Sequence, residues 1–164
     1  MNGAAGYHEY FEYRHYPLRL PRLVDGADPV RHPVAIVGAG PIGLAAAIDL
    51  ALHGIDFIVI DDNNTVSVGS RAICYAKRAL EILDRLGCGE AICRRGVEWK
   101  VGKVFFHDEL AYQFDLLPEP GHKRPAFVNL QQYHLEECMV ERLQALGHSV
   151  RWKSRAVGID ARGD

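Results

Sequence analysis

The sequence predicts an α/β fold: a strand–helix–strand unit with parallel strands, followed by a β-hairpin that belongs to another layer. A short β-branched run at 34–37 ends in the turn GAGPIG at 38–43, and an Ala/Leu-rich segment and a second apolar run at 56–60 follow it. Further along, apolar and polar residues alternate from 97 onward, which is typical of a strand with one solvated face.

Each glycine of the turn has a mechanical role in such a unit. Gly38 lets the chain leave the strand sharply, Gly40 leaves room for a pyrophosphate beside the backbone, and Gly43 lets the helix pack closely on the strand. Pro41 suits the first turn of a helix, where its missing N–H would have no intrahelical partner. The backbone at this helix start, including Ile42, is therefore the predicted phosphate cradle.

The helix predicted over 41–53 is apolar on nearly every face, so we expect it to be covered on both sides. A second parallel strand at 56–60 then places Asp61 about 20 residues after the glycines, where a carboxylate can accept hydrogen bonds from ribose hydroxyls. Asp61 and the following Asp62 disfavour a 2′-phosphate. We interpret the unit as a dinucleotide site rather than a coincidental glycine turn.

Composition limits the classes of function. The chain has 164 residues and a formal net charge of −2, which predicts one domain and gives no electrostatic case for binding nucleic acid or an anionic membrane. No apolar run resembles a signal peptide or a membrane span, so we expect a cytoplasmic protein; a homo-oligomer is left open. The cysteines have no zinc-site spacing, and we expect no metal site: Cys74, Cys88, Cys93 and Cys138.

Residues 1–32 form an extension rich in aromatic residues, and three prolines make a long regular element there improbable. We interpret this extension as lying on the folded body or on a neighbouring subunit; a mobile leader is the alternative. Residues 33–164 would then be a nucleotide-binding domain, of which this chain holds a part.

The remaining patterns predict helices, a hairpin and two further strands. In chain order these are helices at 74–86 and 89–95, a hairpin at 97–116 that turns at 107–109, an apolar run at 126–130, a helix at 134–146, and strands at 148–153 and 156–160. On the helix at 134–146 we expect Glu136 to face solvent. Arg71, just before a helix, is positioned to contact a phosphate or simply to solvate its loop.

The order of these motifs resembles class A flavoprotein monooxygenases, the aromatic hydroxylases similar to para-hydroxybenzoate hydroxylase. The motifs are the glycine turn, the acid after the second strand, GSRA at 69–72 and QYHLE at 132–136. The aromatic leader and the GSRA wording are closest to the 3-(3-hydroxyphenyl)propionate hydroxylase-like branch. The resemblance covers about residues 33–153.

This resemblance implies a Rossmann-like FAD-binding unit and the beginning of a hairpin layer that contributes to substrate binding. It implies NAD(P)H as co-substrate, O2 as oxidant and a small phenolic or aromatic substrate, and it identifies no catalytic residue in this stretch. The implied FAD contacts are the pyrophosphate for Gly38, Gly40 and Gly43, the adenosine ribose for Asp61, the region near the pyrophosphate for Arg71, and the flavin side for Gln132.

Two departures from the family pattern bear on this expectation. Asp61 stands where the family usually has glutamate, which shortens the reach by one methylene. The later Asp-Gly and Gly-Asp segments of the family do not occur before Asp164, so we expect an N-terminal part that alone binds FAD weakly and is inactive. The alternatives are the NAD- or FAD-binding module of another oxidoreductase and a truncated, non-catalytic fragment.

Overall fold

The computed structural model describes residues 11–18, 24–25, 30–69 and 71–161. Its first unit is the predicted strand–helix–strand: β1 (Ala35–Val37), α1 (Pro41–Leu52) and β2 (Ile58–Ile60). The two strands pair in parallel, with Ile36 opposite Val59. A parallel pair joined through a helix is the arrangement that a crossover connection requires, so the α/β class and the parallel pairing are confirmed.

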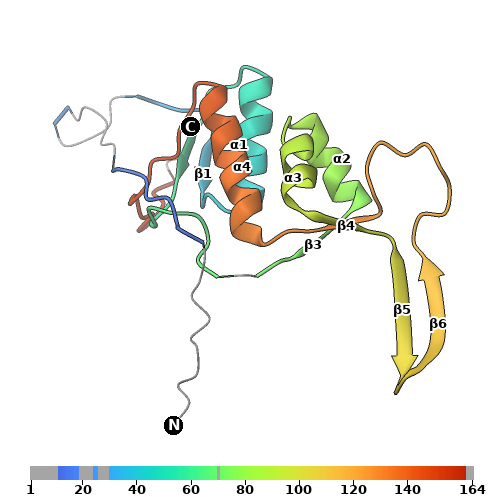
Figure 1. The fold of residues 1–164 in the computed structure, drawn as a ribbon. Coiled ribbons are helices and arrows are strands. Elements are labelled where there is room, and N and C mark those ends of the chain that lie inside the picture. The colour runs from blue at the N-terminus through green and yellow to red at the C-terminus, as the bar shows by residue number, and fades with distance from the viewer. Residues whose placement is uncertain (1–10, 19–23, 26–29, 70, 162–164) are drawn as a thin grey trace, which may run out of the picture.

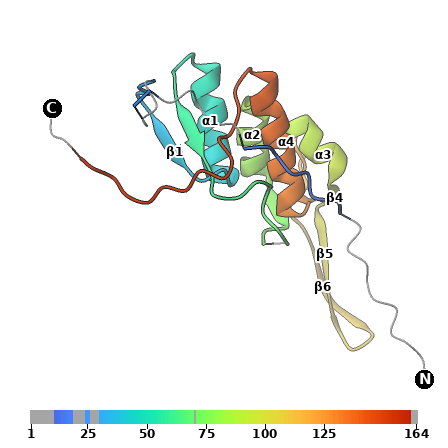
Figure 2. The ribbon, with the colours of Figure 1, turned by 90° about the vertical axis from the view of Figure 1, so that its left-hand side faces the viewer.

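The last long helix, α4 (Gln132–Ala145), lies beside α1, and the two helices cover the same side of the parallel pair (Figures 1 and 2). After α4 the chain returns to the sheet, where Arg151 forms a single parallel bridge with Ile60. The strand predicted at 148–153 thus has the expected direction but is reduced to one bridge. The strand predicted at 156–160 is absent, and Val157 is 94% exposed because no described segment lies against it.

A second layer consists of three short antiparallel strands with two helices beside them. Its elements are β3 (Cys74–Ala76), α2 (Lys77–Arg85), α3 (Gly89–Arg95), β4 (Val97–Trp99) and β7 (Phe127–Asn129). The strand order is β3-β7-β4, with β7 in the centre. The helix predicted at 74–86 is therefore too long at its start, because its first three residues pair with β7 instead of coiling.

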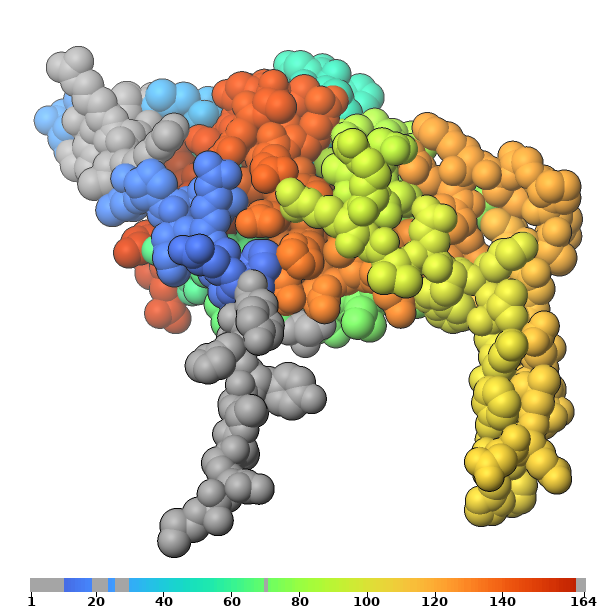
Figure 3. All heavy atoms as spheres, in the orientation of Figure 1, coloured from blue at the N-terminus to red at the C-terminus, as the bar shows by residue number. Residues whose placement is uncertain are grey.

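The predicted hairpin consists of β5 (Val101–Phe106) and β6 (Glu109–Asp115), which pair in antiparallel fashion. His107 lies in the connecting turn, as predicted, and its φ is 51°. The hairpin extends away from the rest of the molecule as a free two-stranded ribbon (Figures 1 and 3). The prediction of one buried face is wrong here, since apolar side chains on both strands, such as Phe106 at 71% and Tyr112 at 58%, are exposed.

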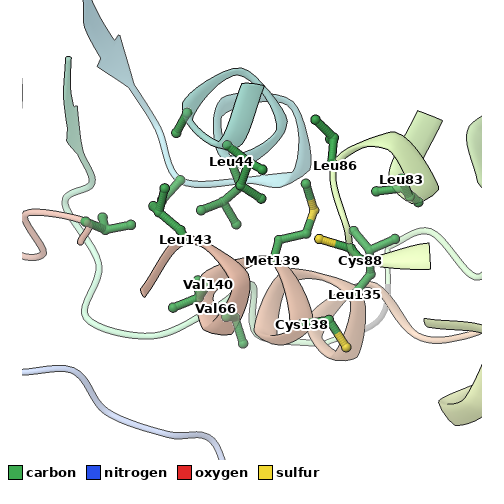
Figure 4. Packing of buried hydrophobic residues seen from close by; sticks show 14 of the residues in the cluster. Leu44, Val66, Leu83, Leu86, Cys88, Leu135, Cys138, Met139, Val140 and Leu143 are labelled. Atoms are coloured by element: carbon green, nitrogen blue, oxygen red, sulfur yellow. The ribbon is translucent and has the colours of Figure 1, made fainter. Parts of the chain in front are cut away.

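The hydrophobic core lies where the four helices meet (Figure 4). Leu44 of α1 lies opposite Met139 and Leu143 of α4, and Cys88 and Leu86 close the side toward α2 and α3. Helix α1 contacts both the parallel strands and α4, so it is covered on two sides as expected. A further face stays open, where Ile42 of the first turn is 84% exposed.

Residues 11–18 lie against the folded body, which confirms that reading of the extension for the part that is described; Tyr7 and Tyr10 lie outside the described residues. The ring of Tyr16 stacks on Trp152, with centroids 4.8 Å apart and planes 11° apart. Both rings are buried, at 5% and 4% exposed. Within the described part of the chain, no helix has the length and apolar character needed to cross a membrane.

Candidate functional site

The glycine turn joins β1 to α1 with very little space between strand and helix. The Gly38 amide donates a hydrogen bond of 2.8 Å to the carbonyl oxygen of Ile60. Gly38 has φ 103°, a backbone conformation that residues with a side chain rarely adopt. A Cβ on Gly43 would come 2.0 Å from the Gly38 carbonyl oxygen, whereas one on Gly40 would meet nothing within 4 Å. The turn is therefore tight on the inside and open toward its outer face at Gly40.

Free amides of the turn and of the first turn of α1 lie together at this outer face. Pro41 occupies the first helical position, Gly40 caps the helix, and the first turn holds no acidic side chain. Among the described residues the N–H groups of Gly40, Ile42 and Gly43 have no acceptor. Unpaired amides at the positive end of a helix dipole form a site for an anion such as phosphate.

Asp61 follows β2 and turns its carboxylate toward the glycine turn. Its Oδ2 accepts a hydrogen bond of 2.7 Å from the Ala39 amide, and its Oδ1 accepts one of 2.8 Å from the Asn63 amide. Each carboxylate oxygen can accept a second bond, so Asp61 holds the turn in place and keeps acceptor capacity for a ligand hydroxyl.

Two hollows open on either side of Asp61. One, of about 280 Å³, is lined by Gly40, Arg71 and residues of the segment 61–69, which we call the site loop. The other, of about 210 Å³, is lined by Gly38 and Asp62 together with the chain after the Arg151 bridge. The structure thus brings the predicted turn, both acids and Arg71 to two hollows that share Asp61, although 33 residues separate Gly38 from Arg71 in the sequence.

The inner wall of the larger hollow contains Glu136, whose position was predicted wrongly from the sequence. Glu136 of α4 was expected to face solvent, but it is 1% exposed. Its carboxylate accepts hydrogen bonds from the Ser67 amide (2.6 Å), the Ser67 hydroxyl (2.7 Å) and Gln132 Nε2 (2.7 Å). Helical spacing places Glu136 beside the apolar face. Burial of its carboxylate is tolerable because Gln132 and Ser67, which is remote in sequence, supply hydrogen-bond donors.

Gln132 and Arg71 differ in their exposure and in whether they line the hollow. Gln132, at the first position of α4, is half-buried and donates to Glu136 and, at 3.3 Å, to the Ser67 hydroxyl; it does not itself line the hollow. Arg71 is exposed, lines the hollow, and among the described residues has no hydrogen-bond or ion-pair partner. An uncommitted guanidinium beside free amides adds positive charge where an anion would lie.

A larger hollow, of about 460 Å³, lies elsewhere, between Tyr16 and the end of α4. It is remote from the glycine turn, and the Tyr16 hydroxyl beneath it is buried without a partner among the described residues. We place the functional site at the turn, because there, among the described residues, free amides, a carboxylate and a guanidinium lie close together. No group of three metal-ligating side chains is assembled in the part of the chain that the structure describes.

The geometry defines a class of protein: an α/β domain whose glycine turn, free helix amides and acid after the second strand form a dinucleotide site. Comparison with known proteins identifies the family. Residues 31–164 match the family model described as FAD binding domain, and the chain belongs to this family.

Relatives of this chain are flavin-dependent monooxygenases. The chain is 30% identical over 139 residues to a flavin-dependent monooxygenase of Mycobacteroides abscessus, covering 80% of this chain and 29% of that protein. It is 28% identical over 134 residues to the para-nitrophenol 4-monooxygenase of Pseudomonas sp. WBC-3, covering 77% and 32%. The crystal structure of p-nitrophenol 4-monooxygenase PnpA from Pseudomonas putida DLL-E4 superposes with a TM-score of 0.72 at 30% identity, covering 80% and 34%.

These matches confirm the resemblance to class A flavoprotein monooxygenases and favour FAD over NAD at the glycine turn. The chain spans about a third or less of the length of these relatives. What the comparisons identify is therefore the FAD-binding domain, and the reaction of a whole protein is a separate question.

Proposed function

We propose that this chain is the FAD-binding part of an NAD(P)H- and O2-dependent monooxygenase that hydroxylates a small phenolic or aromatic molecule. The observation that carries the proposal is that Gly40 of the glycine turn, Asp61 and Arg71 line one hollow, next to amides that lack acceptors among the described residues. The proposal extends the family membership to individual residues and to a reaction.

The residues present fit the two charged and polar parts of FAD that a dinucleotide domain grips. The amides of Gly40, Ile42 and Gly43 would receive the pyrophosphate, because they point outward at a helix start and lack acceptors among the described residues. Asp61, with one free acceptor position on each oxygen, would bind the adenosine ribose. Arg71, which lines the same hollow as Gly40, would neutralise part of the pyrophosphate charge.

Asp62 and Gln132 have supporting places in this proposal. Asp62 lines the smaller hollow next to Asp61, where a further carboxylate favours an unphosphorylated ribose. Gln132 donates to the hydroxyl of Ser67, which lines the larger hollow, and the family resemblance assigns it to the flavin side of the cofactor.

FAD, when bound, supplies the redox chemistry, and the residues of this chain bind and orient it. A phenolic substrate is supported by relatives such as the para-nitrophenol 4-monooxygenase, and NAD(P)H as the electron donor is typical of this family. The four cysteines are free thiols, which fits the cytoplasmic location that we propose.

Titration of the purified chain with FAD, FMN and NAD+, followed by quenching of flavin or tryptophan fluorescence, tests the binding proposal. We expect FAD to bind at least tenfold more tightly than FMN, because FMN lacks the adenosine ribose and the second phosphate that Asp61 and the turn would hold. We also expect FAD to bind more tightly than NAD+. Equal affinity for FAD and FMN would exclude the assigned residues.

The NAD+ titration also tests the second candidate, a module of an NAD-linked oxidoreductase. The acids at 61–62 can bind the ribose of FAD or of NAD+, so the glycine turn and these acids do not by themselves distinguish the two dinucleotides. Tighter binding of NAD+ than of FAD would favour this second candidate and contradict the first.

A further inference from the structure

The N-terminal segment that contacts the site loop lies outside the matched family domain. Residues 11–16, which we call the strap, precede the stretch 31–164 that the family model covers. The strap nevertheless packs on the start of α4: Phe11 lies 4.2 Å from the ring of Tyr133 and 4.8 Å from that of His134, measured between centroids.

The C-terminal end of the strap is anchored in the core. Tyr16 is 5% exposed and stacks on Trp152, which lies next to the bridge between Arg151 and β2. From this anchored position the Tyr16 amide donates a hydrogen bond of 2.7 Å to the carbonyl oxygen of Asn64. The strap therefore holds the site loop near its beginning.

The middle of the strap holds the same loop near its end. The Tyr13 hydroxyl accepts a hydrogen bond of 2.9 Å from the Gly69 amide. The Tyr13 ring is fixed by edge-on contacts with Phe11 (4.7 Å) and Tyr133 (5.6 Å). Gly69 has φ 79° and lies two residues before Arg71 in the sequence, so this bond fixes the backbone close to the residue whose side chain lines the hollow.

The loop is thus fastened on both sides. From inside, Glu136 binds the amide and hydroxyl of Ser67, and from outside the strap binds Asn64 and Gly69. A loop tied at three points along six residues keeps one shape before any ligand arrives. Such preorganisation lowers the entropic cost of binding.

We propose that the strap is a positioning element of the nucleotide site and that the Tyr13 hydroxyl is its positioning group. The bond to Gly69 holds residues 66–69, next to the hollow that Arg71 lines, in one shape. This inference rests on the proposed FAD site for its effect on affinity, whereas the tethering of the loop stands independently of the ligand.

Tyr13→Phe in the full chain tests this role, because it removes the hydroxyl and retains the packed ring. Tyr112→Phe is the matched control, since Tyr112 is 58% exposed on the hairpin. Three quantities are measured for each variant: amide hydrogen exchange of residues 66–71 without ligand, the Kd for FAD, and the melting temperature of the ligand-free chain.

We expect Tyr13→Phe to speed exchange at 66–71 at least threefold and to weaken FAD binding three- to tenfold, with a melting temperature within about 2 °C of the parent. Tyr112→Phe should change none of these. Unchanged exchange, or faster exchange with unchanged FAD affinity, would overturn the positioning role. A fall in melting temperature that accounts for the lost affinity would also overturn it, since the hydroxyl would then be structural.

Absence of FAD binding by the parent chain would contradict the proposed function. The exchange measurement would still decide whether Tyr13 tethers the loop, so the two failures are distinguishable.

Discussion

At the residue scale, the two glycines at 40 and 43 have different physical reasons for lacking a side chain. Gly43 faces the carbonyl of Gly38, so a Cβ there collides with backbone that cannot yield. Gly40 has ordinary backbone angles of φ −74° and ψ −177° and open space where a Cβ would lie. Gly43 serves the fold, and Gly40 leaves room for a ligand.

These roles predict opposite effects of two alanine substitutions. Gly43→Ala should lower the free energy of unfolding by roughly 1 to 3 kcal/mol or more, as overpacking does. Gly40→Ala should leave it nearly unchanged and weaken FAD binding about tenfold, or about 1.4 kcal/mol. Urea denaturation and FAD titration of both variants check this. Normal FAD affinity in Gly40→Ala would contradict a pyrophosphate at the turn.

Glu136 is a buried carboxylate whose two oxygens accept three hydrogen bonds. Glu136→Gln replaces one acceptor oxygen by a donor that faces other donors, so we expect a loss of about 1 to 3 kcal/mol in the free energy of unfolding. Glu141→Gln, on the exposed side of the same helix, is the control and should change it little. Equal stability of the two variants would mean that Glu136 does not hold the site loop.

At the element scale, Asp84 near the end of α2 is joined to the loop that precedes β7. Its carboxylate accepts a hydrogen bond from the buried Arg124, and Lys123 Nζ lies 2.6 Å from its Oδ2. Hydrogen bonds from Arg124 and then Lys123 hold the pKa of Asp84 below its ordinary value of 3.8. The folded state therefore binds this proton less readily than the unfolded state.

The sign of the pH effect follows from this lowered pKa. The ionised Asp84 contributes its full stabilisation above the unfolded-state pKa of about 4, and the contribution is lost as pH falls through the folded-state pKa. Asp84→Asn should thus be less stable than the parent at pH 7, and the difference should shrink below about pH 4. Urea denaturation from pH 2 to 7 measures it, with Asp108→Asn in the hairpin turn as control. A difference independent of pH would refute the ion-pair explanation.

The β5–β6 hairpin has no cover on either face among the described residues, and its edges are free of neighbouring strands there. A two-stranded ribbon is marginally stable in water without a surface to pack on. We expect amide hydrogens at 101–115 to exchange at least a hundredfold faster than those of α4, which packs on α1. Slow exchange at 101–115 in dilute chain would show that the ribbon is covered by something that the structure does not contain.

At the scale of the whole molecule, the parallel unit and the antiparallel layer are joined through α4, which packs on α1 and on α3. The site lies at the edge of this assembly, where the carboxyl ends of strands β1 and β2 meet the site loop (Figure 2). Helix α4 contributes to both, since Leu143 enters the core and Glu136 holds the loop.

Local sequence determined those parts of the fold in which neighbours along the chain decide the conformation. The glycine turn, α1 and β2 follow from the consecutive residues 33–61, and α3, the hairpin turn and most of α4 follow from equally local patterns, although α4 begins at Gln132, two residues before the predicted start. The resemblance in motif order also predicted the FAD-binding family that the comparison confirms. The ligand contacts of Gly38, Asp61, Arg71 and Gln132 are proposals for experiment.

Tertiary structure alone decided the features that depend on partners far apart in the chain. Residues 74–76 became a strand because β7 pairs with them, and Glu136 became buried because Ser67, 69 residues away, supplies donors. The bond between Tyr13 and Gly69 is likewise a long-range contact, with no local pattern to announce it. Hydrophobic periodicity reports which face of an element is apolar, but it carries no information about which distant polar group will meet a buried one.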